Sequence, residues 1–161
     1  MTEYRGAVDS GGRRFAVVVS RFNATITDRL LAGALACLEA HGAAANDVDV
    51  LSVPGAFELP VAALHAAQSG YKAVIAIGCV IRGDTPHFEY VAGGAAQGLM
   101  QAALQTGVPV SFGVLTTETL EQALDRAGGR TGNKGWDAAL TAMEMADLIE
   151  QMPQREGERE R

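Results

Sequence analysis

The feature of this sequence that most restricts its fold is an unbroken run of small and aliphatic residues at 73–81, Ala-Val-Ile-Ala-Ile-Gly-Cys-Val-Ile. Turn residues bound the run, and its length suits a strand. Helices cover both faces of a parallel strand, so such a strand is apolar throughout instead of alternating. We therefore expect this run to be the central strand of a parallel sheet.

The residues that follow this run, Arg-Gly-Asp-Thr-Pro-His at 82–87, indicate a binding site. Pro86 stands where a helix can begin, which puts His87 in the first helical turn. In open parallel sheets, ligands bind beyond the carboxyl ends of the strands, where helix amino termini leave backbone N–H groups unpaired. His87 can move protons near neutral pH, and Arg82 and Thr85 add a cation and a hydroxyl beside it. The segment predicts a site for a small anionic substrate.

The composition fits a single small enzyme. The chain has 161 residues, 48% of them hydrophobic and 20% charged, which suffices for one globular domain with its own core. The net charge of -6 argues against nucleic acid as the main partner, because phosphate neutralisation needs a basic face. The apolar runs are too short to span a membrane, and the first ten residues lack an apolar secretory core, so we expect a cytoplasmic protein without membrane contact.

The two cysteines do not suggest a disulfide. Cys37 falls in a predicted helix and Cys79 in the predicted central strand, so we interpret both as small buried hydrophobic residues. The sequence contains no spacing of cysteine and histidine residues that is typical of a metal site.

Strand and helix signals alternate along the chain. Further strands are expected at 15–20, 47–53 and 110–115, and helices at about 25–41, 60–70, 87–105, 117–128 and 136–150. Thr25 and Asp28 have the spacing of a capping box at the first helix. Strands separated by helices imply right-handed crossovers. The predicted fold is therefore three-layer α/β and flavodoxin-like, with a four-stranded parallel sheet between helices on both faces.

Three parts are expected along the chain: an extended N-terminal arm at 1–12, one α/β domain at 13–150, and a polar tail at 151–161. The segment 128–135 is rich in glycine and is predicted to be a loop. After Pro153 the tail has no apolar residue, so we expect it to be solvated and disordered.

Aromatic residues gather near the predicted strand ends. Phe22 and Phe57 follow the first and second strands, Phe112 lies within the fourth, and Glu58 adds a carboxylate. Taken singly, each Phe is better explained as a core residue. Taken together, the three could stack on a planar heterocycle while Glu58 accepts hydrogen bonds from sugar-like hydroxyls.

Four motifs, in order, closely resemble the lumazine synthase family of riboflavin biosynthesis: Ser20-Arg21-Phe22-Asn23, Val53 to Pro60, Gly78 to Phe88, and Asp125 to Gly128 followed by Gly132-Asn133-Lys134-Gly135. The resemblance is collinear from about Phe15 to Ile149, which makes it far more specific than any single motif. It implies condensation of 5-amino-6-(D-ribitylamino)uracil with 3,4-dihydroxy-2-butanone 4-phosphate to 6,7-dimethyl-8-ribityllumazine, with release of phosphate and water. It also implies that no metal or organic cofactor takes part.

The resemblance carries roles onto individual residues. Phe22 would stack on the pyrimidine ring, and the other contacts to the ribitylaminouracil would come from Ala56, Phe57, Glu58, Cys79, Val80 and Ile81. Asp84 and Thr85 would bind the substrate phosphate. Arg126 of a neighbouring subunit would hold the same phosphate, and Phe112 of that neighbour would close over the ring. His87 would shuttle protons.

Alternative interpretations remain for several of these residues. A histidine after a proline at a helix start is more often structural, and Arg126 alone would be a solvated helix charge. Lys134 fits a cationic positioning role better than a Schiff-base nucleophile, because the substrate brings its own amine. A non-catalytic flavin or lumazine carrier, or a shell protein, could keep the aromatic pocket without turnover. Such a binder would not need the proton shuttle and the phosphate anchor together.

The resemblance also implies a homo-oligomer. The helix after His87 is rich in residues that let helices approach closely, namely Ala92, Gly93, Gly94, Ala95, Ala96, Ala102 and Ala103. It would line the axis of a pentamer. Family members that stop at pentamers tend to carry extra residues before the last helix, whereas the segment 128–135 is short here. We therefore expect twelve pentamers to close into a sixty-subunit icosahedral shell.

Overall fold

The computed structural model describes residues 1–153 and contains a four-stranded parallel sheet with strand order β2-β1-β3-β4. The strands are β1 (Phe15–Ser20), β2 (Val48–Val53), β3 (Ala73–Ile81) and β4 (Val110–Thr117). β3 pairs with β1 on one side and with β4 on the other, and it is buried along almost its whole length. The central strand predicted from the apolar run is therefore confirmed. The predicted polar tail lies outside the described residues from position 154 onward.

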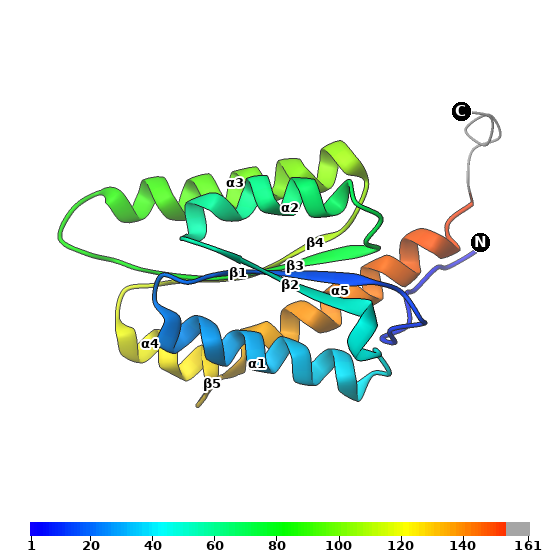
Figure 1. The fold of residues 1–161 in the computed structure, drawn as a ribbon, viewed down its shortest axis with the longest axis horizontal. Helices are drawn as coiled ribbons and strands as arrows, with labels where there is room; N and C mark the ends of the chain where they lie inside the picture. Colours follow the sequence, from blue (N-terminus) through cyan, green and yellow to red (C-terminus); the bar gives the residue numbers. More distant parts are fainter. Residues whose placement is uncertain (154–161) are drawn as a thin grey trace.

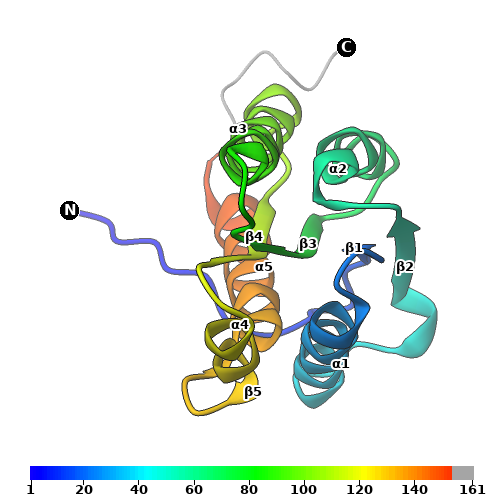
Figure 2. The same ribbon diagram turned by 90° about the vertical axis from the view of Figure 1, so that its left-hand side faces the viewer.

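Helices cover both faces of the sheet (Figures 1 and 2). One layer consists of α1 (Ala24–Ala40), α4 (Leu120–Arg126) and α5 (Lys134–Gln151), and the other of α2 (Leu59–Ala67) and α3 (His87–Thr106). Alternate strand residues point to opposite layers. Phe15 and Ile75 pack toward α1 and α5, whereas Val18 and Val74 pack toward α2 and α3. The predicted three-layer flavodoxin-like α/β fold is confirmed.

Three local expectations differ from the structure. The capping box predicted at Thr25 is absent, because α1 begins at Ala24 and Asn23, in the left-handed conformation with φ 62°, precedes it without a side-chain cap. β4 continues to Thr117, so α4 begins only at Leu120, where Thr119 and Gln122 form a reciprocal capping box. The loop predicted at 128–135 contains a small antiparallel hairpin, with β5 (Ala127–Gly129) and β6 (Gly132–Asn133).

Short 3₁₀ turns precede β2 and α2. They span Ala45–Asp47 and Ala56–Glu58, and the second connects the carboxyl end of β2 to the start of α2. Within residues 1–153, no helix has both the length and the apolar character required to cross a membrane.

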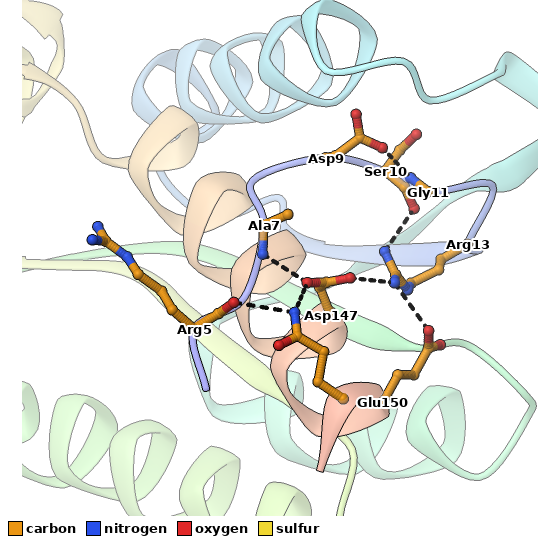
Figure 3. A network of polar contacts seen from close by, with 9 residues as sticks. Arg5, Ala7, Asp9, Ser10, Gly11, Arg13, Asp147 and Glu150 are labelled. Carbon is orange, nitrogen blue, oxygen red and sulfur yellow. Dashed lines mark hydrogen bonds and ion pairs between the residues drawn. The ribbon is translucent and has the colours of Figure 1, made fainter. Parts of the chain in front are cut away.

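The arm at 1–12 has no helix or strand and folds back along α5 (Figure 3). The Ala7 N–H donates to Asp147 Oδ2 at 2.7 Å, and Gln151 Nε2 donates to the Arg5 carbonyl at 3.1 Å. Arg13 closes the network through ion pairs with Asp147 at 2.7 Å and Glu150 at 2.9 Å. We call these contacts the arm latch. The latch ties the residues before β1 to the last turns of α5.

Candidate active site

A pocket of about 640 Å³ opens at the carboxyl ends of β1, β2 and β3, where α3 begins. This is the position at which open parallel sheets bind ligands, and the volume suits a small organic molecule. The residues that line it are Phe22, Gly55, Ala56, Phe57, Glu58, Cys79, Val80, Ile81, Gly83, Thr85, His87, Phe88, Tyr90 and Val91.

Nine of the site residues predicted from the sequence share this wall: Phe22, Ala56, Phe57, Glu58, Cys79, Val80, Ile81, Thr85 and His87. Five further residues line the pocket and were not predicted from the sequence: Gly55, Gly83, Phe88, Tyr90 and Val91. Tyr90 and Val91 stand three and four residues after His87 on α3. Helical spacing from His87 was therefore the signal that could have found them.

The three phenylalanines predicted near the strand ends are exposed. Phe22 retains 70% of its accessible surface, Phe57 63% and Phe112 48%, so the interpretation of these residues as ordinary core is wrong. Large apolar side chains left in solvent at a concave surface mark a ligand or partner site. A Cβ on Gly94 of α3 would lie 2.9 Å from Cε2 of Phe57, so the glycine makes room for the Phe57 ring.

Phe22 is held by an unusual backbone turn. The Phe22 N–H donates to the Pro54 carbonyl at 3.1 Å. The next residue, Asn23, is in the left-handed conformation, and its side-chain Nδ2 donates to the Cys79 carbonyl at 2.9 Å. A left-handed conformation costs free energy in a residue other than glycine, and such residues cluster at functional sites. Asn23 therefore links the ends of β1 and β3 directly beneath the pocket.

His87 is the first residue of α3 and lies exposed at the pocket wall. Its backbone N–H faces Thr85 Oγ1 at 3.5 Å. Within residues 1–153, the backbone N–H groups of Asp84 and Thr85 form no hydrogen bond. They stand just before a helix of 20 residues, where unpaired N–H groups and the helix dipole favour an anion.

Cys79 contributes a neutral thiol to the pocket. Desolvation by burial raises the pKa of Cys79 from its ordinary value of 9.0 to about 11. The nucleophilic form of cysteine is the thiolate, which is nearly absent at neutral pH when the pKa lies this high. Cys79 therefore serves as an apolar wall residue.

Arg82 directly follows β3 and is not among the residues that line the pocket. Its guanidinium forms an ion pair with Glu89, donates from Nε to Glu118 at 2.6 Å, and lies over the Phe88 ring at 4.4 Å from the centroid. Hydrogen bonding to Glu89, followed by that to Glu118, raises the pKa of Arg82 above its ordinary value. The same contact with Arg82 lowers the pKa of Glu89.

Four other predicted residues also lie outside the lining of this pocket. Asp84 is in the turn before α3, and Phe112 lies on the edge strand β4. Arg126 ends α4, where its Nη1 donates to the Gln122 carbonyl at 2.9 Å, and Lys134 begins α5, 3.6 Å from Asp137. Residues 1–153 contain no group of side chains arranged to hold a metal ion.

The fold and the pocket together define the class of this protein. It is an α/β protein of flavodoxin-like architecture with an aromatic-walled site beyond the carboxyl ends of its strands and an ionisable imidazole at a helix start. The model of the 6,7-dimethyl-8-ribityllumazine synthase family matches residues 12–150, and the chain belongs to that family. The resemblance noted in the sequence is thereby confirmed, and the chain is an enzyme of riboflavin biosynthesis.

Relatives of the same name are similar over nearly their whole length. The 6,7-dimethyl-8-ribityllumazine synthase of Syntrophus aciditrophicus is 54% identical over 152 residues, which cover 94% of this chain and 99% of the relative. That of Chlorobium luteolum is 51% identical, with 93% and 97% covered. That of Desulfatibacillum aliphaticivorans is 52% identical, with 91% and 95% covered.

Proposed function

We propose that this pocket condenses 5-amino-6-(D-ribitylamino)uracil with 3,4-dihydroxy-2-butanone 4-phosphate to 6,7-dimethyl-8-ribityllumazine, with release of phosphate and water. One observation carries the proposal. In a member of this family, an exposed aromatic wall and the imidazole of His87 face the same pocket at the start of α3. A planar heterocycle can stack on the wall while the histidine moves protons beside it.

The aromatic wall and the strand ends are assigned to the ribitylaminouracil. Phe22 stacks on the pyrimidine ring, while Ala56, Phe57 and Glu58 hold the ribityl chain. The Glu58 carboxylate accepts hydrogen bonds from the ribityl hydroxyls. Backbone atoms at the end of β3, from Cys79, Val80 and Ile81, meet the polar edge of the uracil. All seven residues line the pocket.

The turn before α3 is assigned to the phosphate of the second substrate. The unpaired N–H groups of Asp84 and Thr85 and the Thr85 hydroxyl can donate to phosphate oxygens, and the helix dipole adds to this preference. Arg126 of a neighbouring subunit supplies a fixed cation to the same phosphate, and Phe112 of that subunit closes over the ring. Lys134 acts as a further positioning cation.

His87 is assigned the proton transfers. The aryl amine of the first substrate attacks the ketone of the second, and water leaves to give a Schiff base. Elimination of phosphate then leaves an enol that becomes a second ketone. The ribityl-bearing amine attacks this ketone and closes the ring with loss of a second water, and each step moves a proton near neutral pH. An imidazole suits these steps because its charge changes in that pH range.

We also propose that the chains assemble into pentamers and that the protein is cytoplasmic. α3 exposes Tyr90, Met100 and Leu104, which single chains rarely leave in water, so we assign this face to contacts between five subunits around an axis. The hairpin segment before α5 is short, which leaves room for pentamers to close into a sixty-subunit icosahedral shell. Cys37 and Cys79 are both free, as is usual in a reducing cytoplasm.

The test is a mixing experiment with both substrates. Purified wild-type protein is expected to form the lumazine chromophore, which a carrier without turnover would not form. Arg126→Ala and His87→Ala chains are each expected to be strongly impaired. Co-refolded mixtures should recover activity, because some interfaces then pair an intact His87 with an intact Arg126. Separately refolded parents, mixed afterwards as intact oligomers, are the control.

The two possible negative results contradict different parts of the proposal. A wild-type protein that binds the uracil substrate without forming product would overturn the proposed reaction. Co-refolded mixtures no more active than the parents would overturn the placement of Arg126 across the subunit interface while leaving the reaction in place.

A further inference from the structure

Arg82 makes contacts with three different elements around the start of α3. Its backbone N–H donates to the Thr117 carbonyl at 2.9 Å, which ties it to the end of β4. Its side chain pairs with Glu118 just beyond β4 and with Glu89 in the first turn of α3. The guanidinium also lies over the ring of Phe88. Phe88 and Glu89, the two residues that follow His87, are therefore both held by the Arg82 side chain.

We propose that Arg82 is a positioning residue, which fixes the first turn of α3, and with it the imidazole of His87, against the end of β4. This inference rests on the proposed role of His87. It replaces the expectation that Arg82 contacts the substrate as a free cation, because its donors are directed to two carboxylates.

The turn that carries His87 has few other anchors. Gly83 has open space where a side chain would stand, and residues 82–87 are all exposed. Phe88 is half-buried and packs against the core beneath α2 and α3. Arg82 covers this ring with its guanidinium, and the contact between a cation and an aromatic face is attractive. Phe88 is thus held between the core and Arg82, directly beside His87.

The segment that carries Glu118, the partner of Arg82 beyond β4, is also fixed. The Glu118 N–H donates to Gln122 Oε1 at 2.8 Å, and Gln122 belongs to the capping box with which α4 begins. The carboxylate of Glu118 therefore projects from a backbone that is already ordered. Arg82 connects that ordered segment to the turn of His87, and a contact at each end prevents the turn from sliding along the sheet.

The expected effect is on rate more than on stability. Exposed ion pairs contribute little to the free energy of unfolding. A misplacement of about 1 Å of a catalytic group can nevertheless lower a rate by about a hundredfold. Loss of Arg82 should therefore lower kcat while both KM values change little.

Substitution of Glu118 distinguishes a positioning role of Arg82 from direct binding of the substrate. If Arg82 contacted the substrate phosphate, removal of the Glu118 charge would free the guanidinium and leave affinity equal or better. If Arg82 positions the turn, Glu118→Gln reproduces the Arg82→Gln defect, and the double variant is no worse than Arg82→Gln alone.

The experiment compares assembled wild-type protein with Arg82→Gln, Glu118→Gln and the double variant. Glu121→Gln, which removes an exposed carboxylate from the first turn of α4, is the matched control. We expect kcat to fall about tenfold in the first two variants, with both KM values within about twofold of wild type. Amide hydrogen exchange of the peptide covering 83–91 should become faster in the same variants and stay unchanged in Glu121→Gln.

Several outcomes would overturn the proposal. An unchanged kcat in Glu118→Gln, or a rise confined to the KM of the butanone phosphate, would make Arg82 a substrate ligand or a bystander. Slower turnover without faster exchange would have the same meaning. If Arg82→Gln does not assemble, Glu118→Gln and Glu89→Gln carry the test. Hydrogen exchange reports on the turn even in an inactive protein, whereas a fully active His87→Ala variant would overturn the proposed function instead.

Discussion

His87 combines exposure, an ionisable ring and a position at the start of α3. In the proposed mechanism, the neighbouring groups of the pocket still position the substrates when the imidazole is removed, so its loss should affect proton transfer and leave binding largely intact. His87→Ala is therefore expected to lower kcat by about ten- to a thousandfold with small changes in KM. Steady-state kinetics with both substrates measure this effect, and turnover within about twofold of wild type would contradict the proton-shuttle role.

Cys79 offers a pH-dependent test of the pocket. With a pKa of about 11, its thiolate fraction at pH 8 is about a hundredfold smaller than that of a thiol with the ordinary pKa of 9.0. In a Cys37→Ala variant, alkylation of Cys79 by iodoacetamide should be slow at pH 8 and should accelerate about tenfold per pH unit until the pH approaches 11. The same variant in denaturant is the control. Equal rates in the folded and denatured protein at pH 8 would show that the thiol is not desolvated.

Among the elements, the arm and α5 are joined by the arm latch rather than by a secondary-structure pairing. Hydrogen bonding from the Ala7 N–H is the largest effect that lowers the pKa of Asp147, and Gln151 and Arg13 lower it further. A lowered pKa means that the latch stabilises the folded arm at neutral pH. This contribution is lost only as the pH falls through the lowered value.

Asp147→Ala should therefore release the arm without unfolding the domain. We expect trypsin to cleave after Arg5 and Arg13 about tenfold faster than in wild type at pH 7.5, while circular dichroism stays unchanged. Asp28→Ala, which removes an exposed carboxylate from α1, is the matched control. Equal cleavage rates in all three proteins would mean that Gly6, whose backbone packs against Glu144 of α5, holds the arm without the latch.

The elements that sequence could predict are those whose burial leaves a pattern. β3 was predictable because both of its faces are covered and its residues are apolar throughout. The junction of β4 and α4 was not, since Thr116, Thr117 and Thr119 suit both a strand and a helix cap. The hairpin of β5 and β6 depends on Gly128 and Gly132 at φ 94° and 85°. Left-handed glycines of this kind are indistinguishable from loop glycines in a sequence.

The candidate active site also contains a part that the sequence could predict and a part that it could not. Residues directly after the strands could be placed at one rim from topology alone, since parallel strands end together. The contacts of Arg82 could not, because Glu118 is 36 positions away and becomes its neighbour only through the pairing of Ile81 with Thr117. A sequence shows Arg82 as a cation beside a histidine, and only the register of β3 against β4 shows where its donors are directed.

In the proposed assembly, the active site requires more than one chain, because Phe112 and Arg126 do not line the pocket of their own chain. Chains of 16.8 kDa in sixty copies give a shell with a mass on the order of 1 MDa. Sedimentation velocity in phosphate buffer at moderate ionic strength should show this species. The net charge of -6 per chain opposes closure at low salt, so the shell should be less abundant there. A single species near the pentamer mass at all concentrations would exclude the shell.

β2 is an edge strand of the sheet, and Val50 at its middle retains 46% of its accessible surface. An edge strand with unpaired backbone groups and an exposed apolar side chain is a template on which another chain can add a strand, which is how aggregates and fibrils begin. An isolated subunit is therefore a species at risk of misassociation. Attempts to engineer a stable single-chain form should begin at this strand. A lysine, or a proline at a position whose backbone N–H points away from β1, would block the addition of another strand.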